Sequence, residues 1–123
     1  MLDVLYREEI LEHYKNPLNF GRLKSFDVFS KQLNPFCGDE IEIFLKFQQK
    51  SLKTKFNISF VGNGCAICIA ATSILTEYAK NKTIKELTKF SEKDMLKLLG
   101  VEVSETRKKC ALLGFAVLKD CLK

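Results

Sequence analysis

The sequence predicts an α+β fold: a three-stranded antiparallel sheet with helices packed on one face. Strand-like patterns are concentrated in the first half of the 123 residues and most helix-like patterns in the second half, an order that excludes parallel β–α–β units. Two neighbouring segments of alternating apolar and polar residues, separated by a short polar link, indicate an antiparallel hairpin with one buried face. The length is that of one ordinary domain, so we expect residues 1–123 to form a single domain.

The first predicted element is an amphipathic helix. Apolar residues recur among charged ones at near-helical spacing from residue 2 to residue 15. Asn16-Pro17 ends this helix, because the residue before a proline avoids the α region.

Three strands are expected next. Residues 26–33 form a weakly alternating candidate, and residues 34–39 form a turn that leads into the clearest β pattern, at residues 41–47. A second clear pattern at residues 56–61 completes the hairpin. These segments make up the sheet.

The remaining elements are helices. One is predicted over residues 65–80, after the break at Gly-Asn-Gly. Thr83 and Ser91 each begin a capping-box pattern, Gly100 ends the segment that follows, and Ser104 is placed to cap the last helix. The apolar stripe of that last helix consists of Ala111, Phe115, Leu118 and Leu122.

Composition and charge exclude several classes of protein. The 46% hydrophobic and 28% charged residues are typical of a globular protein, and no apolar run approaches the length needed to span a bilayer. The first residues carry acids and lack the apolar region of a signal peptide, so we expect a cytoplasmic protein. The net charge of +5 is modest and the lysines are dispersed, which is typical of a solvated surface rather than a nucleic-acid interface.

Five cysteines are the most informative feature of the composition, and without an export signal we expect reduced thiols rather than disulfides. Metal binding, thiol chemistry and burial in the core all remain possible for them. They are Cys37, Cys65, Cys68, Cys110 and Cys121.

Three of these cysteines occupy positions that favour a reactive or metal-binding thiolate. Cys37 lies in the turn before the long strand, Cys65 begins a helix, and Cys110 follows the basic triplet 107–109. Thiolates bind zinc, ferrous iron and iron–sulfur clusters. Asp39 could supply a fourth ligand from the same turn as Cys37, although spacing alone is equally compatible with a turn-capping role.

Four segments of the sequence resemble, in order and context, the motifs of the U-type iron–sulfur cluster scaffold family, which comprises IscU, SufU and the N-terminal domain of NifU. The resemblance covers nearly the whole chain and implies a SufE/NifU-like fold. The four segments are 13–21, 34–39, 62–67 and 107–113.

The resemblance implies a scaffold or carrier. Cys37, Asp39, Cys65 and Cys110 would hold iron, a nascent [2Fe–2S] cluster or zinc. Sulfur would arrive as a persulfide from a pyridoxal-phosphate cysteine desulfurase, with Cys110 as the candidate acceptor and Arg107 as an accessory residue. Finished clusters would pass to apo iron–sulfur proteins.

Two departures from the IscU pattern leave the branch of the family open. Lys109 stands where IscU-type members have a histidine before the third cysteine, and residues 103–107 lack their Leu-Pro-Pro-Val-Lys chaperone motif. The sequence around Cys110 resembles the SufU branch, whose members hold zinc and accept persulfide sulfur. The chain is nevertheless too short for the insertion that SufU proteins carry before their last helix.

The alternatives to a scaffold are a zinc-dependent sulfur acceptor that stimulates a desulfurase, a small thiol oxidoreductase and a structural zinc domain. Cys65 and Cys68 form the Cys-x-x-Cys pattern of an oxidoreductase, but the thioredoxin-like reading needs a βαβ context. We therefore interpret Cys68 as a helix-packing residue. A structural zinc domain would unfold without metal, whereas the predicted core is sufficient by itself.

Three further residues lie outside the predicted ligand set. Cys121, in the final turn, is expected in the core or at a frayed end, and His13 is interpreted as a helix-end residue rather than a ligand. Arg107 could orient a partner, pair with Asp39 or remain a solvated charge.

Overall fold

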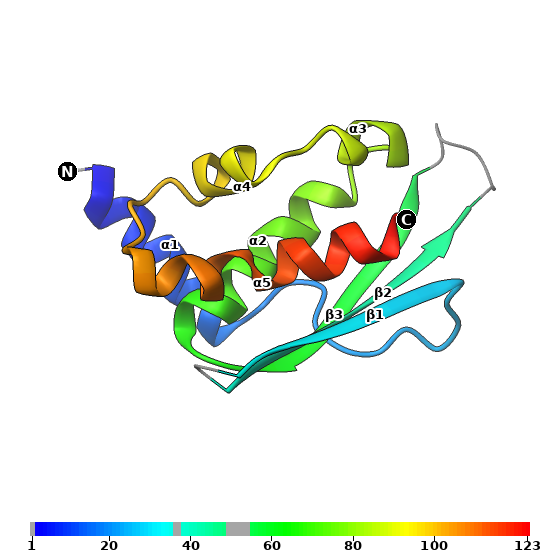
Figure 1. Cartoon of the computed structure of the whole chain (residues 1–123), viewed down its shortest axis with the longest axis horizontal. Coiled ribbons are helices and arrows are strands. Elements are labelled where there is room, and N and C mark those ends of the chain that lie inside the picture. Colours follow the sequence, from blue (N-terminus) through cyan, green and yellow to red (C-terminus); the bar gives the residue numbers. More distant parts are fainter. Residues whose placement is uncertain (1, 36–37, 49–54) are drawn as a thin grey trace.

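The structure, a computed structural model, describes residues 2–35, 38–48 and 55–123 (Figure 1). It confirms the predicted α+β class, with a sheet in the order β1-β2-β3. No helix in these ranges is both long and apolar enough to cross a membrane. The elements are α1 (Leu2–Lys15), β1 (Val28–Asn34), β2 (Asp39–Phe47), β3 (Phe56–Asn63), α2 (Ala66–Ala79), α3 (Ile84–Thr88), α4 (Glu92–Leu99) and α5 (Glu105–Cys121).

The antiparallel register brings one end of each strand to the same end of the sheet. Asn34, the last residue of β1, lies opposite Asp39, the first residue of β2. Glu40 in turn lies opposite Asn63, the last residue of β3. The predicted antiparallel pairing of β2 with β3 is confirmed. The start of β2, which carries Asp39, and the end of β3, which leads to Cys65, lie at this same end of the sheet.

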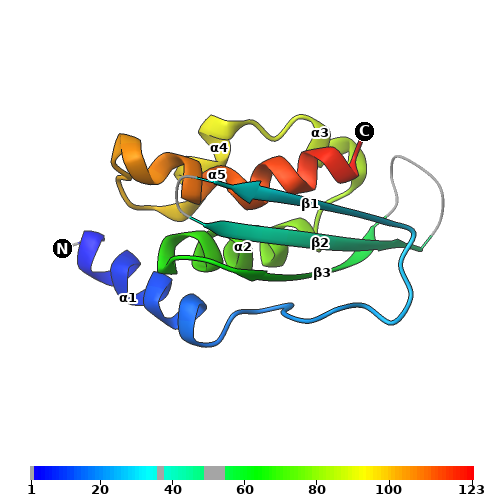
Figure 2. The same ribbon diagram turned by 60° about the horizontal axis from the view of Figure 1, so that its bottom comes forward.

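The helices cover one face of the sheet, as the sequence predicted. Figures 1 and 2 show α2 and α5 lying directly on that face. The core between them includes Ile41, Ile43 and Leu45 from β2, which are fully buried, together with Leu75 of α2 and Leu118 of α5. Burying each such side chain contributes about 1.5–3 kcal/mol. This packing holds α2 and α5 side by side against the strands.

The opposite face of the sheet is more covered than the sequence predicted. Phe44 and Ser59 alternate with the core residues of their strands and so point to the side of the sheet opposite the helices. They are nevertheless only 1% and 7% exposed. The rings of Phe26 and Phe29 pack against Phe44 at centroid distances of 5.0 and 6.1 Å, and the Arg22 guanidinium lies over the same ring. The prediction of a single buried face is wrong here, because Phe26 from the segment before β1 and Phe29 of β1, the cross-strand neighbour of Phe44, supply aromatic cover.

The predicted helix starts are confirmed, with one difference in detail. Thr83 and Ser91 each form a complete capping box, and Gly100 ends α4 in the left-handed conformation with φ 73°. The helix α5 begins after Ser104 as predicted, but the Ser104 side chain makes no capping hydrogen bond. Its hydroxyl lies 3.1 Å from that of Thr106 instead.

His13 has a structural role, in agreement with the interpretation of a helix-end residue. Its Nδ1 lies 2.7 Å from the Ser73 hydroxyl, which also accepts a hydrogen bond from the Leu18 backbone N–H at 2.8 Å. These contacts attach the end of α1 and the loop after it to α2.

Candidate metal centre

Three of the four predicted ligands converge at the end of the sheet. The ligand atoms of Asp39, Cys65 and Cys110 all lie within 4.8 Å of one another. They come from the start of β2, the residue before α2 and the second turn of α5. The fourth predicted ligand, Cys37, lies outside the described residues.

Asp39 joins the sheet to α2 and leaves one oxygen without a partner. The backbone N–H of Cys65 donates a hydrogen bond of 3.0 Å to its Oδ1. Its Oδ2 is buried and has no hydrogen-bond partner within the described part of the chain. A buried carboxylate oxygen without a partner is costly. The arrangement therefore suits a cation bound at Oδ2, beside the two sulfurs.

Two glycines let the chain approach Asp39 closely enough to form the site. A Cβ at Gly64 would lie 2.6 Å from Asp39 Oδ1, and a Cβ at Gly62 would lie 2.4 Å from the Glu40 carbonyl oxygen. The sequence predicted a strand break at Gly-Asn-Gly, whereas β3 continues to Asn63, and the close approach of the two glycines to the start of β2 was not predicted. Any side chain at Gly64 would displace the Asp39 carboxylate.

Cys65 is the N-cap residue of α2, as the sequence predicted. Its backbone is extended (φ −70°, ψ 166°), and its side chain makes no capping hydrogen bond. The Cys65 side chain is half-buried. Negative charge is stabilised at a helix N-terminus by the unpaired amide groups and the helix dipole. A thiolate ligand here would benefit from both.

Cys110 is almost fully buried, with 1% of its surface exposed. The Asn34 side-chain amide contacts its sulfur at 4.0 Å. In the basic triplet before it, Arg107 is exposed and Lys108 forms an ion pair with Glu105 at 2.7 Å. Arg107 does not reach Asp39 in the described structure, since Asp39 Oδ1 bonds to the Cys65 N–H and Oδ2 has no partner.

The other two cysteines belong to the hydrophobic core. Cys68 is 0% exposed, as expected for a helix-packing residue, and Cys121 is 3% exposed. The thiol of Cys121 donates to the Ile43 carbonyl at 3.8 Å. Burial, aided by the charge of Asp120, raises the pKa of Cys121 to about 12. These thiols have the environment of packing residues.

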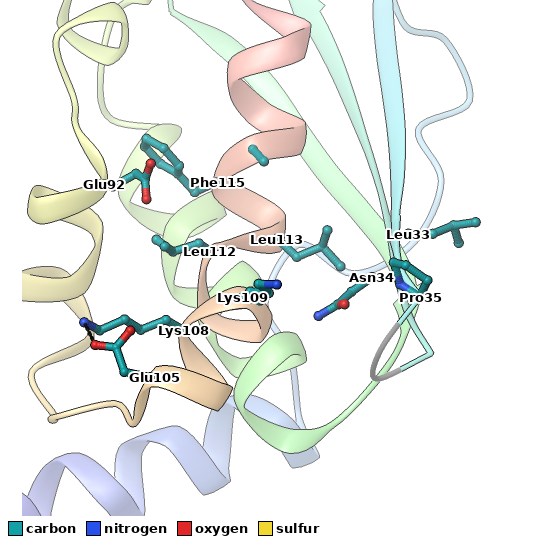
Figure 3. A pocket seen from close by; sticks show the side chains of 11 residues that line it. Leu33, Asn34, Pro35, Glu92, Glu105, Lys108, Lys109, Leu112, Leu113 and Phe115 are labelled. Carbon is teal, nitrogen blue, oxygen red and sulfur yellow. Dashed lines mark hydrogen bonds and ion pairs between the residues drawn. The ribbon is translucent and has the colours of Figure 1, made fainter.

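A pocket of about 550 Å³ opens beside Cys110, between the end of β1 and α5 (Figure 3). Asn34, which contacts the Cys110 sulfur, and Lys109, which precedes Cys110, both line it. Leu112 and Leu113 contribute apolar surface. A partner segment could thus approach Cys110 from this side.

The donor set fits zinc or ferrous iron. Both ions accept thiolate together with carboxylate ligands, and four ligands in a tetrahedron are typical of zinc. Asp39, Cys65 and Cys110 would supply three of them and leave a fourth position for Cys37 or an exogenous group. Two thiolates and a carboxylate reduce a divalent cation to a net charge of about −1, and a third thiolate to about −2.

The fold and the site define a class of small α+β domains that present a cysteine and aspartate cluster at one end of an antiparallel sheet. The chain belongs to the NifU-like N terminal domain family, which it matches over residues 5–123.

Two of the named relatives of this chain come from an archaeon and a bacterium. It is 34% identical over 96 residues to the iron–sulfur cluster assembly scaffold protein IscU 1 of Archaeoglobus fulgidus, covering 78% of this chain and 61% of that protein. It is 33% identical to the zinc-dependent sulfurtransferase SufU of Bacillus subtilis, covering 96% and 89%. The match thus spans about three fifths of the Archaeoglobus protein but most of the Bacillus one.

A solved structure agrees with the fold. The iron–sulfur cluster assembly scaffold protein for the SUF system from Fervidobacterium islandicum superposes with a TM-score of 0.78 at 26% identity and covers 98% of both chains.

Proposed function

We propose that this protein is an iron–sulfur cluster assembly scaffold. Cys37, Asp39, Cys65 and Cys110 would hold iron or a nascent [2Fe–2S] cluster as cargo, or zinc in its place. One observation carries the proposal: Asp39 Oδ2 is buried without a hydrogen-bond partner in the described chain, in a cluster that also contains two thiols. The name of the Archaeoglobus relative, an iron–sulfur cluster assembly scaffold protein, supports the same function.

Sulfur would be delivered by a pyridoxal-phosphate cysteine desulfurase as a persulfide. The Cys110 thiolate would attack the outer sulfur, the S–S bond would break, and the desulfurase thiolate would leave. Because Cys110 is 1% exposed, the transfer requires a local opening of the site. The pocket lined by Asn34 and Lys109 offers a route of approach, and the exposed Arg107 lies on the same helix for contact with the partner.

Release to apo iron–sulfur proteins would depend on Asp39. A carboxylate is a harder and weaker partner for an iron–sulfur cluster than a thiolate. A site with Asp39 would hold the cluster less firmly than one with four cysteines. The cargo could then pass to an acceptor.

The test is anaerobic purification after co-expression with the cognate desulfurase, followed by measurement of iron, zinc and acid-labile sulfide. We expect iron and sulfide in equal amounts, with both lost in Cys65→Ser and Cys110→Ser. The matched control is Cys121→Ala, a change in a core cysteine, which should keep them. Metal content that does not depend on Cys65 or Cys110 would refute the scaffold.

A second candidate function is zinc-dependent sulfur transfer. The match to the Bacillus sulfurtransferase supports it, because that match covers 96% of this chain and 89% of the relative. In this version zinc would hold the thiols until the desulfurase arrives. Three observations would favour sulfur transfer over the scaffold function: zinc in the purified protein, no sulfide after reconstitution, and faster turnover of the desulfurase.

Both versions require reduced thiols, which supports a cytoplasmic location. In both, residues 1–123 would act as one domain. The oxidoreductase alternative loses support because Cys68 is fully buried.

A further inference from the structure

Asn34 sits where the sheet, the ligand-bearing turn and α5 meet. It is the last residue of β1, and it lies opposite Asp39 in the antiparallel register. Its carbonyl oxygen accepts a hydrogen bond of 2.8 Å from the Gly38 N–H, and Gly38 adopts φ 71°. The backbone of Asn34 therefore fixes the turn from which Asp39 emerges.

The side chain of Asn34 faces the other side of the site. Figure 3 shows it pointing from β1 toward α5, whereas the neighbouring Leu33 points away. Its Nδ2 lies 4.0 Å from the sulfur of Cys110, within hydrogen-bonding range for this large and polarisable acceptor. Cys110 itself is 1% exposed. The contact thus joins two buried residues that are 76 positions apart in the sequence.

The burial of Asn34 is unusual for its strand. The other residues of β1 are half-buried or exposed, and Asn34 is 6% exposed. A polar amide is costly to bury unless it makes hydrogen bonds, and an apolar residue would fill the same space at lower cost. The presence of an amide at this position therefore indicates that its side-chain N–H donates a hydrogen bond.

We propose that Asn34 is a positioning residue of the metal centre, which holds the Cys110 sulfur toward Asp39 through its side-chain amide while its backbone carbonyl fixes the Asp39 turn. This inference rests on the proposed function, because it concerns the same site. An amide N–H donated to a coordinating thiolate offsets part of the negative charge on sulfur and orients its lone pairs. In this way Asn34 sets the position of Cys110 relative to Asp39 without itself binding the metal.

The test compares Asn34→Leu and Asn34→Asp in the full chain. Both keep roughly the shape of the side chain, but leucine removes the donor and aspartate replaces it with a negative charge. Loss of a group that orients a ligand typically lowers metal affinity by about 10- to 100-fold. We expect a loss in this range for Asn34→Leu and a larger loss for Asn34→Asp, measured by zinc competition with a chromophoric chelator. The matched control is Asn57→Leu, a change at an exposed position of β3, which should bind zinc like the wild type.

Two further readouts separate positioning from a merely structural role. The cobalt(II)-loaded variants should show a shifted thiolate-to-cobalt charge-transfer band, which a stability change alone would not move. In the metal-free protein, Cys110→Ala should shift the Asn34 side-chain amide resonances, whereas Cys121→Ala, on the same helix, should leave them in place.

The possible failures are distinguishable. If wild-type metal binding depends on Cys65 and Cys110 but both Asn34 variants bind zinc within about two-fold of wild type, with an unshifted cobalt band, the inference is overturned and the proposed function stands. Wild-type protein that binds neither zinc nor cobalt overturns the proposed function and this inference with it.

Discussion

Gly64 and Asp39 approach so closely that no side chain fits between them. A Cβ at Gly64 would lie 2.6 Å from the Asp39 Oδ1 and 3.1 Å from its Cγ. The same Oδ1 accepts the Cys65 N–H, so the connection from β3 to α2 is held against the start of β2. The position of the Asp39 carboxylate therefore depends on the absence of a side chain at Gly64, the residue before Cys65.

The first prediction concerns this contact. Gly64→Ala should weaken zinc binding by about 10-fold or more, because it displaces the Asp39 carboxylate. It should also lower the free energy of unfolding by about 1–3 kcal/mol through overpacking. Chelator competition and denaturant unfolding measure the two effects. Asn63→Ala, at the exposed neighbouring position, is the control and should change neither. Wild-type affinity in Gly64→Ala would contradict the rigid contact.

The second prediction concerns release of a bound cluster. Asp39→Ala should slow the transfer of a [2Fe–2S] cluster to an apo-acceptor, because it removes the weak oxygen ligand. The measurement is the time course of cluster appearance in the acceptor. Asp39→Asn is the companion variant, since it keeps an oxygen that can accept the Cys65 N–H but removes the charge. Unchanged or faster transfer from Asp39→Ala would count against a labile site.

The third prediction uses the buried thiol of Cys121. Its pKa in the folded protein is raised from 9.0 to about 12, so the folded state keeps the proton at a pH where the unfolded state has lost it. The free energy of unfolding should therefore fall as the pH rises from 9 toward 12, and this contribution should be constant below pH 9. Cys121→Ala should show a shallower alkaline decline in denaturant unfolding. Equal slopes would indicate that the Cys121 thiol is not protected in the folded state.

The fourth prediction contrasts two helix starts. Ser91 accepts the Asp94 N–H and forms a capping box, whereas the Ser104 side chain makes no capping bond. Ser91→Ala should lower the free energy of unfolding by about 0.5–2 kcal/mol, and Ser104→Ala should cost clearly less. Paired denaturant titrations provide the comparison. A larger loss for Ser104→Ala would show that the capping geometry differs in solution.

Local patterns predicted most of the fold because they depend on neighbours in the chain. The capping boxes at Thr83 and Ser91 involve residues three apart, and the β2–β3 hairpin shows its period of two directly in the sequence. The cover over Phe44 was not predictable in this way. It depends on Phe26, which precedes β1, and on Phe29, which becomes the neighbour of Phe44 only once β1 pairs with β2 in register.

The candidate site was likewise predictable from the sequence only where it depends on local patterns. The sequence placed Cys65 at a helix start and Cys110 in the last helix, and both positions are confirmed. Their convergence with Asp39 followed from the family resemblance, because spacing does not reveal how α5 docks on the sheet. The contact of Asn34 with Cys110 was missed for the same reason, since it requires the strand register and the helix position together.

The distribution of the proposed ligands over β2, the residue before α2, and α5 would have a consequence for the order of events during synthesis. A chain that has not yet docked its last helix presents at most the donors before Cys110, and these bind an ion more weakly than the complete set. Metal loading would thereby be restricted to molecules that have finished folding. Conversely, an ion bound to all the donors ties the C-terminal helix to the rest of the molecule, so removal of the ion should loosen α5 before the hairpin.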